Sequence, residues 1–444
     1  MQKSNQDIQI FWFRRDLRLH DNRGWYEALK DIRYPVLPLF IFDSDILASL
    51  PSPYDTRVDA IRQMLQQLNK ELQGLGTSLV IEYGKPIEIF AKLVATYSIA
   101  AVHTNRDYEP YATKRDKEVE LFLQEKQIAF STHKDQVVYE PGEILKPDGK
   151  PYTIFTPYAK TWAKKISIEA FAQCDYTPLA HNVVQRSAQD ILSLADIGFQ
   201  RTSFQYNPPS IPYSIIENYE NTRNFPAIKG TSELGMHLRF GTISIRQLSQ
   251  IAYERNHTFL SELIWREFFM GILFHFPHVQ TRSFKPAYDA ILWINDEAQF
   301  ARWCEGTTGY PMVDAGMRQL NTTGLMHNRV RMVVASFLCK HLLIDWRWGE
   351  AYFASKLMDY DLSANNGNWQ WAAGCGCDAA PYFRVFNPSE QVKKFDPQHN
   401  YIQQWIPEYN TLAYPQPIVN HAFARNRAIE TYKYSLAQEK TNNM

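Results

Sequence analysis

Short apolar runs alternate with amphipathic stretches over about the first 135 residues of the chain. The apolar runs lie at residues 9–13, 36–42, 78–83, 100–104 and 129–132. Between them, residues 56–73, 87–96 and 113–126 carry apolar side chains at helical spacing. Apolar-rich strands are typical of a parallel sheet that is covered on both faces. The pattern therefore predicts an α/β domain with a doubly wound parallel sheet over residues 1–135.

Helical spacing dominates the second half of the chain, where strand patterns nearly vanish. The predicted helices include residues 245–255, 258–274, 311–322, 328–343 and 350–357. This pattern predicts a large all-α domain over residues 213–444, with a partly helical tail after residue 400. Residues 136–212 contain Pro, Tyr and Ser with weak periodicity, so we expect them to form a connector between the two domains.

The composition narrows the classes of protein that the chain can belong to. It has 444 residues, and 47 Lys and Arg balance 47 Asp and Glu, so nucleic-acid binding would need a local basic patch. The five cysteines form no CxxC pair and no Cys/His ligand spacing, so we expect no metal site, no disulfide framework and a reducing compartment. We find no signal sequence and no apolar run that could cross a bilayer, which predicts a soluble cytoplasmic protein that binds no membrane.

A charged turn, Arg14 to Asn22, follows the first predicted strand. A dinucleotide-binding sheet would carry a G-x-G-x-x-G motif here, and this turn has none. We interpret the turn as an ion-pair cluster on the surface. A second polar stretch, Gly230 to Gly235, offers Thr231 or Ser232 as the cap of a following helix, whose free N–H groups can hold a phosphate. An ordinary helix cap explains the same residues.

Three later stretches carry polar side chains among aromatic ones. In the first, Glu262 shares a helical face with Trp265 and Arg266. An unpaired carboxylate among aromatic side chains would be costly, so either Glu262 pairs with Arg266 or both line a pocket for a polar ligand. In the second, Asn328 shares a helical face with Met332. Met beside apolar residues usually fills a core, whereas the basic residues next to Asn328 could contact phosphate groups.

The third stretch runs from Asp359 to Trp371. Asp361, Asn365 and Trp369 are spaced by four residues, and two acids, adjacent amides and a Gly make a poor helix interior. Such local conflicts often mark functional sites, although a solvated turn with packed tryptophans is the alternative. The two acids could serve general acid/base chemistry or bind a ribose or flavin. The chain has no G-x-S-x-G, H-E-x-x-H or P-loop motif.

These stretches together resemble the photolyase/cryptochrome family, and most closely its class I cyclobutane pyrimidine dimer DNA photolyases. The resemblance covers nearly the whole chain. Its most specific parts are ELIWREF at 262–268, TGYPMVDAGM at 308–317, MHNRVRM at 326–332 and DLSANNGNWQW at 361–371. It implies an N-terminal α/β antenna domain and a C-terminal helical domain that binds reduced FAD non-covalently.

The resemblance implies roles for individual residues. Asn365 would face flavin N5, and Arg266, Asp359 and Asp361 would contact the flavin end or its ribitol. The residues implied to hold the FAD phosphate and ribose region are Tyr219, Thr231, Ser232, Glu233, Leu234 and Gly235. The damaged DNA, with its dimer flipped out, would meet Glu262, Trp265, Asn328, Met332 and Trp371. Of these, Trp265 and Trp371 would stack on the flipped dimer, and Glu262 would hydrogen-bond its bases. Further DNA contacts are implied for Arg223, Arg329, Arg384 and Gln391.

The implied chemistry is light-driven electron transfer without a metal. The excited reduced flavin would donate an electron to the dimer, the two inter-base bonds would break, and the electron would return. Trp369, Trp346 and Trp293 would form a relay for photoreduction, although a packed aromatic core explains the same three residues. An antenna chromophore, methenyltetrahydrofolate or 8-hydroxy-5-deazaflavin, is also implied, and Asn105 and Glu109 resemble a folate-binding stretch.

Other functions within the family stay open at this point. A cryptochrome would sense blue light without repairing DNA, and a (6-4) photolyase would repair a different lesion. The intact set of dimer-contacting residues and the short C-terminus argue against a cryptochrome. Met332 and Asn366 argue against a (6-4) photolyase, in which both positions differ. A flavin-binding DNA scaffold without catalysis is the most general alternative. We expect a monomer.

Overall fold

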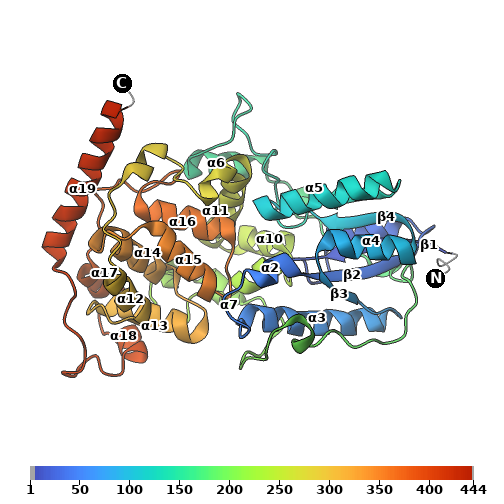
Figure 1. Ribbon diagram of the computed structural model, residues 1–444, viewed down its shortest axis with the longest axis horizontal. Coiled ribbons are helices and arrows are strands. Elements are labelled where there is room, and N and C mark those ends of the chain that lie inside the picture. The colour runs from blue at the N-terminus through green and yellow to red at the C-terminus, as the bar shows by residue number, and fades with distance from the viewer. Residues whose placement is uncertain (1–5, 443–444) are drawn as a thin grey trace. The chain divides into compact units, whose positions relative to one another are not determined.

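The computed structural model describes residues 6–442, and the side chains of residues 6–438. The chain divides into two compact units, each built from separated segments of the sequence (Figure 1). The first unit comprises the chain up to Glu140, Ile166–Ile211 and Leu234–Ile251. The second unit comprises Pro141–Lys165, Pro212–Glu233 and the chain from Ala252 onward. The predicted domain bounds at 135 and 212 assumed contiguous segments and stay a prediction.

The first unit contains a five-stranded parallel sheet with the strand order β3-β2-β1-β4-β5. Strand β1 lies in the middle of this sheet, with β2 and β3 on one side and β4 and β5 on the other. This order is the doubly wound arrangement. The strands are β1 (Asp7–Phe13), β2 (Val36–Asp43), β3 (Val80–Gly84), β4 (Ser98–Asn105) and β5 (Ala129–His133). The helices are α1 (Arg23–Lys30), α2 (Ser44–Ala48), α3 (Thr56–Gly74), α4 (Pro86–Thr96), α5 (Pro110–Glu125), η1 (Ile168–Phe171), η2 (Thr177–Leu179), η3 (Ala195–Ile197) and α9 (Gly235–Arg239).

Both faces of β1 are buried, as its apolar run predicts. Ile10 and Trp12 point to one face, where they pack in a cluster with side chains of α4 and α5. Phe11 and Phe13 point to the other face and contact Trp25 of α1. Figure 1 shows α3 and α5 on opposite sides of the sheet. The predicted α/β domain with a doubly wound parallel sheet is therefore confirmed.

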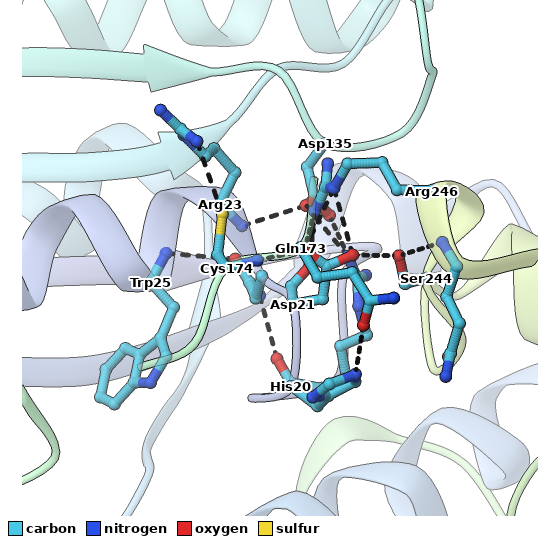
Figure 2. A network of polar contacts seen from close by, with 12 residues as sticks. His20, Asp21, Arg23, Trp25, Asp135, Gln173, Cys174, Ser244 and Arg246 are labelled. Carbon is cyan, nitrogen blue, oxygen red and sulfur yellow. Dashed lines mark hydrogen bonds and ion pairs between the residues drawn. The ribbon is translucent and has the colours of Figure 1, made fainter. Parts of the chain in front are cut away.

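The charged turn after β1 forms an ion-pair network, but the prediction that this network lies on the surface is wrong. Asp21 is fully buried, and Arg18 is only 8% exposed. Arg18 donates to both carboxylate oxygens of Asp135, at 2.9 and 2.8 Å. Arg246 donates to Asp21 and Asp135, at 2.9 and 2.8 Å (Figure 2). The backbone N–H of Cys174 also donates to Asp21. The turn is therefore the centre at which four separated segments of the first unit meet.

All regular elements that the structure describes in the second unit are helical. They are α6 (Phe155–Lys165), α7 (Tyr213–Glu217), α8 (Tyr219–Thr222), α11 (His257–His275), η4 (Pro277–Gln280), η5 (Pro286–Ala290), α12 (Glu297–Glu305), α13 (Pro311–Thr323), α14 (Asn328–Ser336), η6 (Phe337–His341), α15 (Trp346–Lys356), α16 (Leu362–Ala373), α17 (Pro388–Phe395), α18 (Asn400–Trp405) and α19 (His421–Asn442). Helix α10 (Ile245–Arg255) begins in the first unit and ends in the second. The predicted all-α domain is confirmed.

Two predicted segments differ from the structure. The predicted helix 328–343 ends as an α-helix at Ser336 and continues as the π-helical segment η6. The predicted connector contains α6, a regular helix whose buried side chains are Phe155, Tyr158 and Trp162. Between residues 6 and 442, no helix combines the length and the apolar character needed to cross a membrane.

Candidate functional site

A cavity in the second unit brings together seven of the predicted site residues. It encloses about 600 Å³ of empty space, open solvent at its mouth included, and lies between α14, α15, α16 and the segment before α16. Asn365 and Trp369 in its lining are buried, whereas Asn328 and Asn368 are exposed, so the cavity opens to solvent on one side. The predicted residues in its lining are Asn328, Met332, Asp359, Asp361, Asn365, Trp369 and Trp371.

Helix α16 supplies most of this lining. The polar sequence that suggested a poor helix interior forms a regular helix, because Asp361 caps its N-terminus by accepting from the N–H groups of Ser363 and Ala364. Asn365 and Trp369 follow at spacings of four, so they share the face that lines the cavity. The alternative of a solvated turn is wrong.

Helix α15 lies close against the buried part of α16. Gly349 permits this approach, because a Cβ atom at this position would overlap the indole of Trp369. The side-chain amide of Asn365 donates to the side-chain Oε1 of Glu350 at 2.8 Å and to its backbone carbonyl at 3.1 Å. Burial raises the pKa of Glu350, and the bond from Asn365 offsets part of that rise. Both contacts use the Nδ2 group of Asn365, so they fix the amide's orientation and leave its oxygen for another partner.

Asn366, by contrast, is part of the scaffold. It is 2% exposed, lies outside the cavity lining, and donates to the backbone carbonyl of Val279 at 3.0 Å. Gln370, one turn later, donates to the same carbonyl at 2.9 Å and to the Asn366 side chain at 3.1 Å. These two amides attach the back of α16 to the segment after α11.

Glu262 forms an ion pair with Arg223, with 2.5 Å between Nη1 and Oε1. From the sequence, either a pair between Glu262 and Arg266 or a ligand pocket lined by both residues was expected. Burial raises the pKa of Glu262, and the Arg223 guanidinium offsets part of the rise. The two side chains remain 29% and 26% exposed, so the carboxylate is not enclosed in a core. Arg223 also lies 5.4 Å from the ring centroid of Tyr219, which places a third predicted residue beside the pair.

Trp265 lies one turn after Glu262 on α11 and is half-buried. Its ring stacks on Phe155, with centroids 3.6 Å apart and planes inclined by 7°. Neither Trp265, Glu262 nor Arg266 is part of the cavity lining that contains Trp371. The structure thus places the two predicted dimer-stacking indoles in the same unit, on α11 and α16.

The remaining predicted residues lie in several places. Arg329 donates to Asn224 at 2.7 Å and lies 4.4 Å from the ring centroid of Phe395. Arg384 is exposed, and Gln391 is half-buried in α17. Trp346 and Trp369 are buried in one hydrophobic cluster, and the half-buried Trp293 packs against that cluster.

The predicted capping of a helix by Thr231 or Ser232 is wrong. Helix α9 begins at Gly235, and its N-cap is Leu234, whose side chain makes no capping hydrogen bond. Thr231, Ser232 and Glu233 belong to the second unit, whereas Leu234 and Gly235 belong to the first. The role of this segment at the FAD phosphate stays a prediction.

Comparison with known proteins identifies the family. Residues 9–178 match a family model described as DNA photolyase, and residues 259–413 match one described as the FAD binding domain of DNA photolyase. The deoxyribodipyrimidine photo-lyase of Escherichia coli is 36% identical over 96% of this chain and 98% of its own length. The enzyme of the same name from Halobacterium salinarum is 34% identical over 97% of this chain and its full length.

The chain belongs to the DNA photolyase family.

Solved structures support the family membership along the entire chain. A class III photolyase from Agrobacterium tumefaciens superposes with a TM-score of 0.86 at 32% identity, covering 98% of both chains. A cryptochrome from Synechocystis superposes with a TM-score of 0.83 at 26% identity, over 97% of this chain and all of the other. The predicted resemblance to the photolyase/cryptochrome family is thus confirmed, and the protein is an enzyme.

The predicted FAD cofactor of this DNA photolyase is likewise confirmed by the matching FAD-binding domain. The cavity suits such a group, because a flavin needs apolar surface for its rings and polar groups for its edge. Phe353, Leu357 and Trp369 supply the apolar surface, and Asp361 and Asn365 supply the polar edge. Arg331, which also lines the cavity, holds Asp359 in an ion pair at 2.9 Å. Among the described residues, no group of three or more His, Cys, Asp and Glu is arranged to hold a metal ion.

The two residues that suggested a folate site in this DNA photolyase have partners within the first unit. Asn105 is 2% exposed and donates to Asp16 at 2.5 Å and to Asn22 at 2.8 Å. Glu109 accepts from Arg15 at 2.8 Å and also pairs with Arg239. Both residues therefore stabilise the turn after β1.

The sequence did not predict three contacts of the site. These are the hydrogen bond from Asn365 to Glu350, the ion pair of Arg223 with Glu262, and the stacking of Phe155 on Trp265. Glu350 lies in an ordinary helical pattern, and no spacing relates it to Asn365 on a different helix. Only the packing of α15 against α16 reveals this contact. The stacking of Phe155 on Trp265 is likewise revealed only by packing, because Phe155 lies in a segment that we had interpreted as a connector.

Proposed function

We propose that this DNA photolyase repairs UV-damaged DNA by splitting cyclobutane pyrimidine dimers in a light-dependent reaction. The observation that supports the proposal is an open cavity that joins Asn365 and Asp361 with Met332, Asn328 and Trp371. The first pair suits a flavin edge, and the other three suit a base that has been flipped out of the duplex. The proposal includes the class I assignment that the motifs imply, although one similar structure is of class III.

The chemistry that reduced FAD supplies when bound is light-driven electron donation to the dimer. The chain's own residues position the two partners. Because Glu350 accepts both bonds from the Asn365 amide, the Asn365 oxygen is left as an acceptor, which suits an N–H donor such as N5–H of a reduced flavin. Asp361 caps α16, and Arg331 orients Asp359, so both acids are held at the cavity.

The Arg223–Glu262 pair links two proposed functions, contact with the DNA backbone and contact with the damaged bases. When a DNA phosphate competes for the Arg223 guanidinium, Glu262 loses the charge that keeps its pKa from rising further. Loss of that charge favours the protonated carboxyl, which can donate a hydrogen bond to a carbonyl of the dimer.

Glu262→Ala is expected to weaken dimer binding and repair roughly 5- to 150-fold while leaving FAD content unchanged, because a buried carbonyl that loses its hydrogen-bond donor costs about 1–3 kcal/mol. Dimer loss in an irradiated thymine-dimer oligonucleotide and the flavin absorbance measure the two effects. Glu220→Ala, an exposed acid on neighbouring α8, is the control. Equal repair by the Glu262 variant and the wild type would remove Glu262 from the site.

Trp371→Ala is expected to weaken binding to dimer-containing DNA about 5- to 150-fold, because stacking on one base contributes about 1–3 kcal/mol. Titration of a fluorescent dimer oligonucleotide measures the affinity. Trp405→Ala is the matched control, since Trp405 is also half-buried and packs on the same core but does not line the cavity. Similar losses in both variants would point to general destabilisation rather than to stacking.

The cysteines and tryptophans support two further parts of the proposal. Trp369 is buried at the cavity, Trp346 is buried in the same cluster, and Trp293 reaches partial exposure, which is the order needed for an electron path to the surface. The five free cysteines suit a reducing compartment, in keeping with a cytoplasmic enzyme. We also propose an antenna chromophore, as the archaeal photolyase from Sulfolobus tokodaii is described with two FAD molecules and with the implication of a novel light-harvesting cofactor.

A cryptochrome function is the second candidate, since the Synechocystis cryptochrome superposes over nearly the entire chain. The presence of Met332 and Trp371 in the cavity favours repair. Met332 also argues against a (6-4) photolyase, whereas Asn366 carries no weight on substrate choice because it is a scaffold residue.

One assay separates these functions. The photoreduced protein is mixed with oligonucleotides that carry either a thymine dimer or a (6-4) photoproduct, and each mixture is irradiated with blue light or kept dark. Light-dependent loss of the thymine dimer alone is the expected result. Bound flavin without repair of either lesion would favour a cryptochrome, and repair of the second lesion would favour a (6-4) photolyase.

A further inference from the structure

The indole of Trp265 has one of its faces covered by another aromatic ring. Phe155 lies parallel to it, at 3.6 Å between centroids and 7° between planes. Phe269, one turn later on α11, lies 5.4 Å away with a tilt of 29°, so its contact is offset. Trp265 nevertheless remains half-exposed, which leaves part of its ring surface accessible.

Phe155 itself is fixed by its surroundings in the second unit. It is the first residue of α6, it is 9% exposed, and its ring edge contacts Phe268 at 5.8 Å and 77°. The next turns of α6 are attached to α11, because Trp162 donates to the buried carboxylate of Glu267 at 2.6 Å. Helix α6 is therefore bound along one face to the helix that carries Trp265.

The start of α6 is held by Asp378. The backbone N–H of Phe155 donates to Oδ2 of Asp378 at 3.0 Å. Asp378 has a φ of 48°, a left-handed conformation that Asp tolerates better than most residues. It lies in the segment that directly follows α16, the helix of Trp371. One contact chain therefore connects α16 through Asp378 and Phe155 to Trp265.

We infer that Phe155 is a positioning residue for lesion recognition, and that Asp378 fixes Phe155 in place. Phe155 occupies one face of the Trp265 indole, so a flipped base can stack only on the part of the indole that stays exposed, in an orientation that is set before DNA binds. Such preorganisation strengthens binding by reducing the side-chain freedom lost in the complex. This inference rests on the proposed function and on the role that the family resemblance implies for Trp265, which is stacking on the dimer.

The test compares Phe155→Leu, which removes the ring, with Phe155→Tyr, which keeps it. Phe155→Leu is expected to weaken affinity for dimer DNA roughly 2- to 12-fold, because an aromatic pair contributes about 0.5–1.5 kcal/mol beyond its buried area. Repair per absorbed photon at saturating DNA, FAD content and affinity for undamaged DNA should not change. Phe155→Tyr should retain wild-type affinity. Asp378→Ala should weaken dimer affinity, and Asp378→Asn, which keeps an acceptor oxygen, should restore it.

A double-mutant cycle shows whether Phe155 acts through Trp265. In a Trp265→Ala background, Phe155→Leu should have no further effect on dimer affinity. An equal effect in both backgrounds, or unchanged affinity in Phe155→Leu, would overturn the inference while leaving the proposed function intact. If the wild type neither repairs the dimer nor prefers dimer DNA to undamaged DNA, the proposed function and this inference both fail.

Discussion

Asp135→Asn is expected to lower the free energy of unfolding of the first unit by about 3–5 kcal/mol, because it leaves two buried guanidinium groups without their shared carboxylate. Asp135 is 2% exposed and accepts from Arg18 and Arg246. Burial alone would raise its pKa, but the two arginines together hold the pKa below the ordinary value. Thermal unfolding followed by far-UV circular dichroism would measure the loss as a lower Tm.

The matched control in the same unit is Asp31→Asn. Asp31 also pairs with an arginine, but Arg33 is 74% exposed, so water screens the pair and the Tm should stay near that of the wild type. Equal Tm values for the Asp135 and Asp31 variants would show that the buried network contributes no more than a surface pair. The network would then have no special role in joining the segments shown in Figure 2.

Lys340→Met is expected to stabilise the second unit near pH 6, by up to roughly 5 kcal/mol. Lys340 is 1% exposed, donates to the carbonyl of Ala373 at 2.8 Å, and lies 3.6 Å from the ring centroid of Tyr432. No carboxylate in the described part of the chain pairs with it. Burial lowers its pKa from 10.5 to about 7, and each pKa unit corresponds to about 1.36 kcal/mol. The carbonyl keeps a partner in the variant, because Tyr432 also donates to it.

The lowered pKa of Lys340 also predicts how the stability of the wild type depends on pH. Between about pH 7 and the ordinary lysine pKa, the unfolded chain binds this proton and the native protein does not, so the stability of the wild type rises with pH through Lys340. The buried thiols act in the opposite direction above about pH 8.5, because burial raises the pKa of Cys375 to about 12. The difference in Tm between wild type and variant cancels the thiol contribution and should shrink as the pH rises from 6 to 9.

Lys393→Met serves as the control, since Lys393 is 72% exposed on α17. The Tm of Lys393→Met should differ from that of the wild type by a small amount that stays constant between pH 6 and 9. A Lys340→Met variant that is less stable than the wild type at pH 6 would mean that the contact with Tyr432 outweighs the cost of burying the ammonium group.

The local pattern of residues was enough to predict most regular elements. The strand 129–132 and the helix 245–255 match β5 and α10, because each signal depends on the spacing of apolar side chains within one short segment. The motif from Asp359 to Trp371 was equally informative about the site, since all its cavity residues lie on one helix or just before it. Residues on one helical face stay together in any fold that preserves the helix.

The sequence alone therefore determined the fold class, the family resemblance and the group of residues at the cavity. The tertiary structure decided what each polar or aromatic group contacts. Asp135 meets Arg18 across 117 positions of sequence, and Asn365 meets Glu350 on another helix. Arg223 rather than Arg266 pairs with Glu262, and Phe155 covers Trp265. Helix and strand periods act within a few residues, whereas these contacts depend on how separate segments pack, which no local period encodes.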